Sequence, residues 1–226
     1  NKQLKNLEMA SGYQDALTAS LKSDHMDHFN FLIESGANPD PYKDRQSGWT
    51  PLTMAAKHEN NKALKTLLKL GADVDVANYA GESAFKVLST GDDSSTIRKC
   101  LRTLIKANAD VTRCDNEGYA AIHNFAVDCS VETMKVLIEE ALIPIELPKG
   151  RPEEEIGFST PLLCALSMAN NEVATYLHEK GASLTTGKTG SNIFAAIIQG
   201  AAEFSTTTEL ESPIHWLKLA LAAGAN

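Results

Sequence analysis

One run of residues, the stretch ASLTTGKT that starts at Ala182, has the spacing of a phosphate-binding loop. Gly187, Lys188 and Thr189 match the end of that motif, while Ala182 stands where the motif has its first Gly. Such a loop cradles phosphates when it follows a strand and opens a helix. Here the segment 171–180 has the pattern of a helix and precedes the run. We therefore expect an ordinary loop, and a nucleotide-dependent activity stays as the weakest alternative.

The histidines are the next candidates for chemistry. His25 and His28 are three residues apart and could share one face of a helix, but two ligands are too few for a closed zinc site. The remaining histidines are spread over the chain, at His58, His123, His178 and His215. No G-x-S-x-G string marks a nucleophile elbow. We expect no catalytic residue, no metal site and no cofactor, and hence a protein that is not an enzyme.

Cysteines and charge narrow the setting. The four cysteines form no C-x-x-C pair, which favours free thiols in a reducing cytosol. Lys and Arg number 21 against 29 Asp and Glu, so the net charge is −8 and a broad footprint for nucleic acid is absent. No apolar run approaches the ~20 residues of a membrane helix, and the N-terminus has no signal-peptide core. We expect a cytoplasmic protein that binds no nucleic acid and does not insert into a membrane, with a pathogen effector delivered into a host cell as the alternative.

The elements that would position any site follow from a repeated signature. Each copy is an apolar run, then Gly or a substitute, then Ala and a polar residue, as in LLKLGADVD. The Gly positions and their substitutes are Gly36, Gly71, Asn108, Ala141, Gly181 and Gly224. The first two intervals are 35 and 37 residues, and the interval of 73 from Asn108 to Gly181 has room for the degenerate copy at Ala141. The sequence therefore predicts six units.

Each signature predicts the end of a helix. Gly readily takes the left-handed conformation that closes a helix, and Asn is the next-best residue for it. Ala141 is a poor residue at this position, so we expect a frayed or re-routed turn in the fourth unit.

The front of each unit predicts the start of another helix. An opening Gly is followed by a residue that favours the N-cap in five of six copies, Ala120 being the exception. These cap residues are Asp15, Thr50, Ser83, Thr160 and Asn192. Pro51 and Pro161 then occupy the first helical position. An apolar residue comes next in every copy, at Leu17, Leu52, Phe85, Ile122, Leu162 and Phe194.

Each unit thus reads as helix, short turn, helix and loop. One such pair cannot cover its own apolar face, whereas stacked pairs can. We expect an all-α solenoid of about six stacked helix-turn-helix units with hairpin-like loops, forming a single domain over residues 1–226. The expected units are approximately 12–47, 48–80, 81–117, 118–156, 157–189 and 190–226.

Residues 48–81, GWTPLTMAAKHENNKALKTLLKLGADVDVANYAG, resemble an ankyrin repeat. Residues 157–185 also match the family pattern well. The other copies are weaker but in phase, so the resemblance covers roughly residues 12–226. His123 stands at the helix-capping His of the family, and Thr53 replaces that residue in the best copy.

Three insertions depart from the family pattern. They are GDDSS in the third unit, the stretch 145–157 between the fourth and fifth units, and GAAEFSTTTEL at 200–210 in the sixth. We expect them in surface loops, where insertions are tolerated. The stretch from Ser212 is interpreted as the start of a second helix, and the ending GAN, without a polar cap, suggests a fragment of a longer protein.

The resemblance implies a binding surface at the loop tips and at the ends of the first helices. On these grounds we expect partner contacts at Trp49, Lys57, His58, Tyr79, Glu82, Asn116, Glu117, Tyr119, Asp128 and Met168. Three aromatic residues in this set would anchor the ligand, and its charged residues would select it. The alternative is that these aromatic side chains merely cover neighbouring helices. The acidic run 153–155 is expected to be a solvated loop face, or otherwise a docking lip for a basic partner.

The resemblance therefore implies a non-catalytic scaffold that binds a protein or peptide in a concave groove. The alternative is a regulatory segment of a larger enzyme, channel or pathogen effector that packs on a neighbouring domain of the same polypeptide.

Overall fold

The computed structural model describes residues 16–17, 19–21, 26–37, 48–91, 93–150, 160–185, 193–204 and 211–225. In these residues the chain is helical, and its one β-type contact is the isolated bridge between Ala77 and Ser83. The chain divides into two compact units, Asn1–Asn116 and Glu117–Asn226. The helix-turn-helix copies within them are called repeats from here on. The expectation of an all-α fold is confirmed for the described residues. The number of six repeats and the single domain stay predictions.

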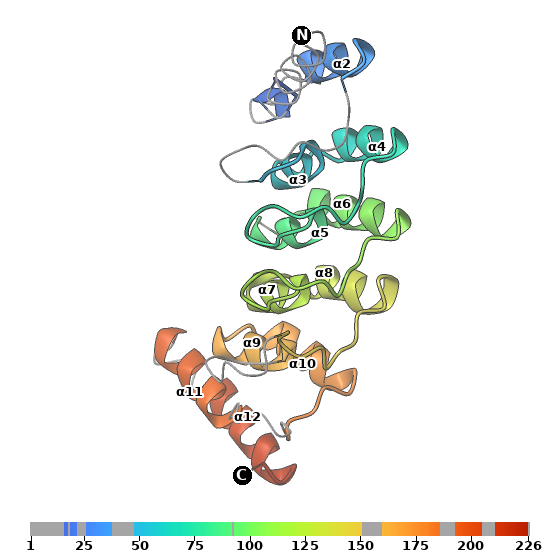
Figure 1. Ribbon diagram of the computed structural model, residues 1–226. Coiled ribbons are helices and arrows are strands. Elements are labelled where there is room, and N and C mark those ends of the chain that lie inside the picture. Colours follow the sequence, from blue (N-terminus) through green and yellow to red (C-terminus); the bar gives the residue numbers. More distant parts are fainter. Residues whose placement is uncertain are drawn as a thin grey trace. The chain divides into compact units, whose positions relative to one another are not determined.

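Among its described residues, the first unit contains two consecutive helix pairs, and before them one further helix and the helical residues 16–17 and 19–21. This further helix is α2 (Met26–Glu34). The pairs are α3 (Pro51–Lys57) with α4 (Asn61–Lys69), and α5 (Ala84–Val87), extended by the 3₁₀ turn η1 (Leu88–Thr90), with α6 (Ser95–Lys106). Between the pairs, α3 packs on α5 and α4 packs on α6, so like helices stack on like (Figure 1).

The second unit repeats this arrangement three times. Its pairs are α7 (Ala121–Asp128) with α8 (Val131–Lys135) and the π-helical turn η2 (Val136–Glu140), α9 (Pro161–Ser167) with α10 (Asn171–Glu179), and α11 (Ile193–Phe204) with α12 (Glu211–Ala222). Helix α9 packs against α7 on one side and α11 on the other, and α10 packs on α8. Figure 1 shows these pairs along the second half of the chain.

The helix starts follow the predicted caps. The hydroxyls of Thr50, Ser83 and Thr160 each accept a hydrogen bond from the backbone N–H three residues later. The first helix of the fourth repeat has Ala120 at its N-cap, which offers no side-chain acceptor. The His123 ring supplies a partner there instead. The Ala120 N–H donates to Nδ1 of His123 at 3.2 Å, and the Thr50 N–H donates to Oγ1 of Thr53 at 2.8 Å. The two residues therefore occupy equivalent capping positions.

The core consists of the apolar positions that the repeat pattern shares. Leu17, Leu52, Phe85, Ile122 and Leu162 are all buried in the first helices. The sixth copy differs, because Ile193 is buried while Phe194 is half-buried. Most apolar positions of the second helices are also buried, at Leu67, Leu104, Leu137, Leu177 and Ala220.

The helix-closing positions have the expected backbone in five repeats and a re-routed backbone in the fourth. Gly36, Gly71, Gly181 and Gly224 have positive φ, and Asn108 has φ of 58°. In the fourth repeat Ala141 remains in the right-handed region, and Leu142 takes the positive φ of 56°. The π-helical turn before it adds one residue to the helix, which explains the shift.

The sixth repeat differs from one expectation, that its insertion lies in a surface loop. Residues 200–204 of the insertion are not a loop but the last part of α11, which is therefore 12 residues long. Gly200 lets α11 pack closely on α9, because a Cβ there would clash with the Leu166 carbonyl oxygen. The stretch from Ser212 does lie in the second helix, as predicted.

Candidate functional site

The loop between α4 and α5 is held in one shape by Asn78. Its Oδ1 accepts hydrogen bonds from the N–H groups of Ala80 and Glu82, at 2.9 and 3.0 Å. Its Nδ2 donates to the Glu82 carboxylate at 2.7 Å. Glu82, which the sequence assigned to partner contact, therefore also braces this loop from within.

Successive loop tips of the first unit stack on one another. We define these tips as residues 79–80 and 115–116. The Tyr79 ring packs over Gly48, where a Cβ would lie only 2.7 Å from it. The Asn116 amide donates to the Tyr79 carbonyl at 2.7 Å, and the Asn116 N–H donates to the Ala80 carbonyl at 2.9 Å. Gly48 and Gly81 both have positive φ, so they satisfy a backbone and a packing requirement together.

A buried ion pair anchors the second tip to a helix. The Lys86 ammonium on α5 lies 3.1 Å from the Asp115 carboxylate, and the lysine side chain is 2% exposed. Burial lowers the pKa of Lys86 below its usual range, although the Asp115 charge and hydrogen bond oppose that shift. The loop tips of this unit are therefore a preorganised surface.

The sequence-predicted residues of the first unit lie at both ends of α3. Trp49 comes just before the helix and is half-buried, while Lys57 and His58 are exposed at its end. Tyr79 is 55% exposed on its loop tip. Because α3 has seven residues, its two ends are separated by about 10 Å. Trp49, Tyr79, Glu82 and Asn116 thus belong to the loop side of the unit.

In the second unit, Tyr119 has partners within the protein. The Lys149 ammonium lies 4.0 Å from the centre of the Tyr119 ring, and the His123 ring meets it edge-on at 6.1 Å. His123 Nε2 lies 2.9 Å from the Leu147 carbonyl, and its Nδ1 accepts from Ala120, so we place the proton on Nε2. This network holds the insertion that begins at residue 145 against α7.

The other predicted residues of the second unit lie at the ends of α7 and α9. Glu117 and Asp128 are exposed, and Met168 is half-buried at the C-cap of α9. Some positions considered from the sequence lie outside the described residues. These are the predicted caps Asp15 and Asn192, the motif residues Gly187, Lys188 and Thr189, His25 and the acidic run 153–155.

The described residues contain neither a cluster of metal ligands nor a membrane-spanning helix. Within the described ranges, no group of three or more His, Cys, Asp or Glu side chains is arranged to hold a metal ion. None of the helices so described is long and apolar enough to span a bilayer. Burial raises the pKa of the Cys100 thiol to about 11, which disfavours its reactive thiolate.

Comparison with known proteins finds similar sequences. A sequence model of ankyrin repeats, in three copies, matches residues 2–78. The chain contains ankyrin repeats. A human protein, transient receptor potential cation channel subfamily A member 1, is 27% identical over 163 residues. That alignment covers 72% of this chain and 13% of the channel subunit. The matched family model and the helix pairs agree with the resemblance found in residues 48–81.

Sequence reasoning about this ankyrin-repeat chain missed the residues that fix the tips. The Lys86–Asp115 pair acts through a contact between repeats, which no local pattern reveals, whereas Asn78 braces its own loop through Ala80 and Glu82. One signal was present: Lys86 stands in the first helix directly after the apolar Phe85, at a position where a solvated lysine would be unusual. A buried lysine implies a carboxylate partner from a neighbouring segment.

Proposed function

We propose that this ankyrin-repeat chain is a non-catalytic module that binds a protein or peptide through its loop tips. Ankyrin repeats generally mediate protein–protein interactions and are typically non-catalytic. The partner residues proposed in the first unit are Trp49, Lys57, His58, Tyr79, Glu82 and Asn116. Those proposed in the second unit are Glu117, Tyr119, Asp128 and Met168.

The observation that carries this proposal is the exposed Tyr79 ring on a braced tip. Tyr79 is 55% exposed, yet its backbone is held by Asn116 and its ring rests on Gly48. A rigid, half-exposed tyrosine loses little conformational entropy when a partner covers it. Aromatic residues of this kind are frequent energetic anchors of interfaces.

The test compares two exposed aromatic side chains. Full-length wild-type chain and the variants Tyr79→Ala and Phe31→Ala are used as bait in a cell lysate, and captured proteins are quantified by mass spectrometry. Phe31 is 67% exposed on α2, away from the tips, and serves as the matched control. We expect Tyr79→Ala to weaken the specific partner by about 30-fold, the effect of a ~2 kcal/mol anchor, and Phe31→Ala to change it little.

Both variants should melt close to the wild type, because both rings are largely exposed. If Tyr79→Ala retains every partner that wild type and Phe31→Ala capture, the loop tips are not the binding surface.

A second candidate is a regulatory ankyrin segment of a larger protein. The match to a cation channel subunit, of which the chain spans 13%, favours this alternative. The coding sequence on both sides of residues 1–226 decides it: a channel or catalytic domain in the same reading frame supports this role.

A further inference from the structure

The second helices of the first unit carry an unusual concentration of positive charge. Helix α4 holds Lys62, Lys65 and Lys69, and α6 holds Arg98, Lys99, Arg102 and Lys106. Neither helix contains an acidic residue. A third of the 21 Lys and Arg residues thus lie in two helices of a chain whose net charge is −8. The net charge conceals a local basic patch.

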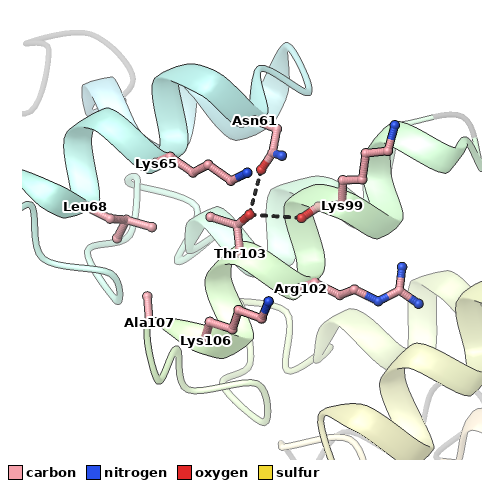
Figure 2. Close-up of a pocket in the computed structure, with 8 residues that line it drawn as sticks. All are labelled: Asn61, Lys65, Leu68, Lys99, Arg102, Thr103, Lys106 and Ala107. Carbon is pink, nitrogen blue, oxygen red and sulfur yellow. Dashed lines mark hydrogen bonds between the residues drawn. The ribbon is translucent and has the colours of Figure 1, made fainter.

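Part of this patch lines a groove between the two helices (Figure 2). The groove has a volume of about 480 Å³. Four of its lining residues are cationic, and the other four are polar or apolar. The set is Asn61, Lys65, Leu68, Lys99, Arg102, Thr103, Lys106 and Ala107.

Helix packing and a hydrogen bond fix the geometry of the groove. The Thr103 hydroxyl on α6 lies 2.6 Å from the side-chain Oδ1 of Asn61 on α4, and 3.0 Å from the Lys99 backbone oxygen. Figure 2 shows Thr103 between the two helices with both contacts dashed. The buried Leu67 and Leu104 belong to the same two helices, which hold them in register. The cationic side chains therefore project from a fixed frame.

The three lysines of the groove, Lys65, Lys99 and Lys106, have no carboxylate partner among the described residues. The nearby Asp93 pairs instead with Arg98, at 3.2 Å, and Arg98 does not line the groove. Several like charges held close together without counter-charges attract an anion.

We propose that this groove binds a small polyanion that carries two or more phosphate groups. Lys99, Arg102 and Lys106 follow one another along α6 over about 10 Å, roughly two helical turns. Such spacing suits neighbouring phosphates on one molecule. Arg102 can contact a phosphate with two parallel hydrogen bonds, and the lysines supply point charges. Leu68 and Ala107 give an apolar wall for the carbon skeleton.

The size of the groove favours a small molecule over an extended anionic surface. A volume of about 480 Å³ lies in the range of ligand pockets. A flat bilayer would meet the exposed lysines and leave the half-buried Asn61 and Thr103 largely uncontacted. This site shares no residue with the proposed protein-binding surface, so either can fail without the other.

Titration calorimetry of the full chain with inorganic tripolyphosphate at physiological ionic strength tests the proposal. We expect saturable binding with a dissociation constant below ~1 mM. The double variant Lys99→Glu/Lys106→Glu should bind at least about tenfold more weakly. The control Lys62→Glu/Lys135→Glu makes the same change in net charge at exposed helix positions outside the groove, and should lose less than about twofold. Equal losses in both, or no binding by wild type, would overturn the proposal.

A charge-conserving variant and three competitors complete the test. Arg102→Lys should weaken binding several-fold because it loses the paired hydrogen bonds, and it should melt like wild type. Vesicles containing phosphatidylinositol bisphosphate, if they compete with tripolyphosphate, identify a lipid headgroup as a source of the ligand. Failure of those vesicles to compete identifies a soluble one. Equal competition by phosphatidylserine vesicles or by a polyglutamate peptide would contradict a phosphate-specific groove.

Discussion

At the scale of single residues, the fourth repeat contains a strained position. Leu142 has φ of 56° and its side chain is 77% exposed, so it gains little from burial. A non-glycine residue in the left-handed region costs about 1–2 kcal/mol. We predict that Leu142→Gly raises the free energy of unfolding by about 1 kcal/mol, since relief of strain outweighs the added freedom of Gly in the unfolded chain. Urea unfolding followed by circular dichroism measures this.

Two further substitutions separate backbone strain from exposed apolar surface. Leu142→Ala removes the apolar side chain but keeps the Cβ, so it should give no comparable gain. Asn108→Gly changes a residue with a similar φ of 58°, but Asn tolerates this conformation, so the gain should be smaller. If Leu142→Ala stabilises as much as Leu142→Gly, the explanation by backbone conformation is wrong.

At the scale of elements, the Lys86–Asp115 pair joins α5 to a loop tip. Removal of one partner from a buried pair leaves an uncompensated charge, which costs about 3 kcal/mol or more. We therefore predict that Asp115→Ala lowers the free energy of unfolding by about 3 kcal/mol. The double variant Lys86→Met/Asp115→Ala should recover part of that loss, because no buried charge remains. A double variant less stable than Asp115→Ala alone would contradict this explanation, because the stranded charge of Lys86 would then not be the cause of the loss.

The lowered pKa of Lys86 makes a separate prediction about pH. The unfolded chain keeps the Lys86 proton up to its ordinary pKa of 10.5, whereas the folded chain releases it at lower pH. Between those two values the unfolded state binds more protons, so the free energy of unfolding rises with pH. Other groups titrate in the same range, and the measured quantity is therefore the difference between wild type and Lys86→Met. That difference should shift in favour of wild type as the pH approaches 10.5, and a constant difference would contradict a lowered pKa.

Sequence reasoning reached these elements to different depths. Thr50, Pro51 and Gly71 act on their own backbone neighbours, so their types reveal helix starts and ends directly. The position of the turn in the fourth repeat depends on whether the helix gains a residue, and Ala141 revealed only that a regular turn was unfavourable. The extended α11 depends on the close approach of Gly200 to α9, which the sequence does not encode locally.

The candidate surfaces were predictable to different extents for the same reason. Tyr79 was accessible to prediction because the repeat pattern fixes which residues lie at loop tips. The basic groove was not found because Lys65 and Lys99 are 34 positions apart and become neighbours only when α4 packs on α6. Both segments lack acidic residues, which was a visible signal of a basic patch. The net charge of −8, summed over the whole chain, does not reveal such a local excess.

At the scale of the whole molecule, a repeat array predicts local rather than uniform loss of stability. Each helix pair contacts mainly its neighbours, so stability is approximately a sum of repeat and neighbour contributions. Leu64 is fully buried in α4, and Leu64→Ala should cost about 3 kcal/mol through the cavity it leaves. We predict that native-state hydrogen exchange then accelerates in α3 to α6, while the amides of α9 and α10 keep most of their protection. The reciprocal variant Leu163→Ala, at a buried position of α9, should reverse the pattern. Equal loss of protection throughout the chain, in both variants, would show that all the repeats unfold as one cooperative unit.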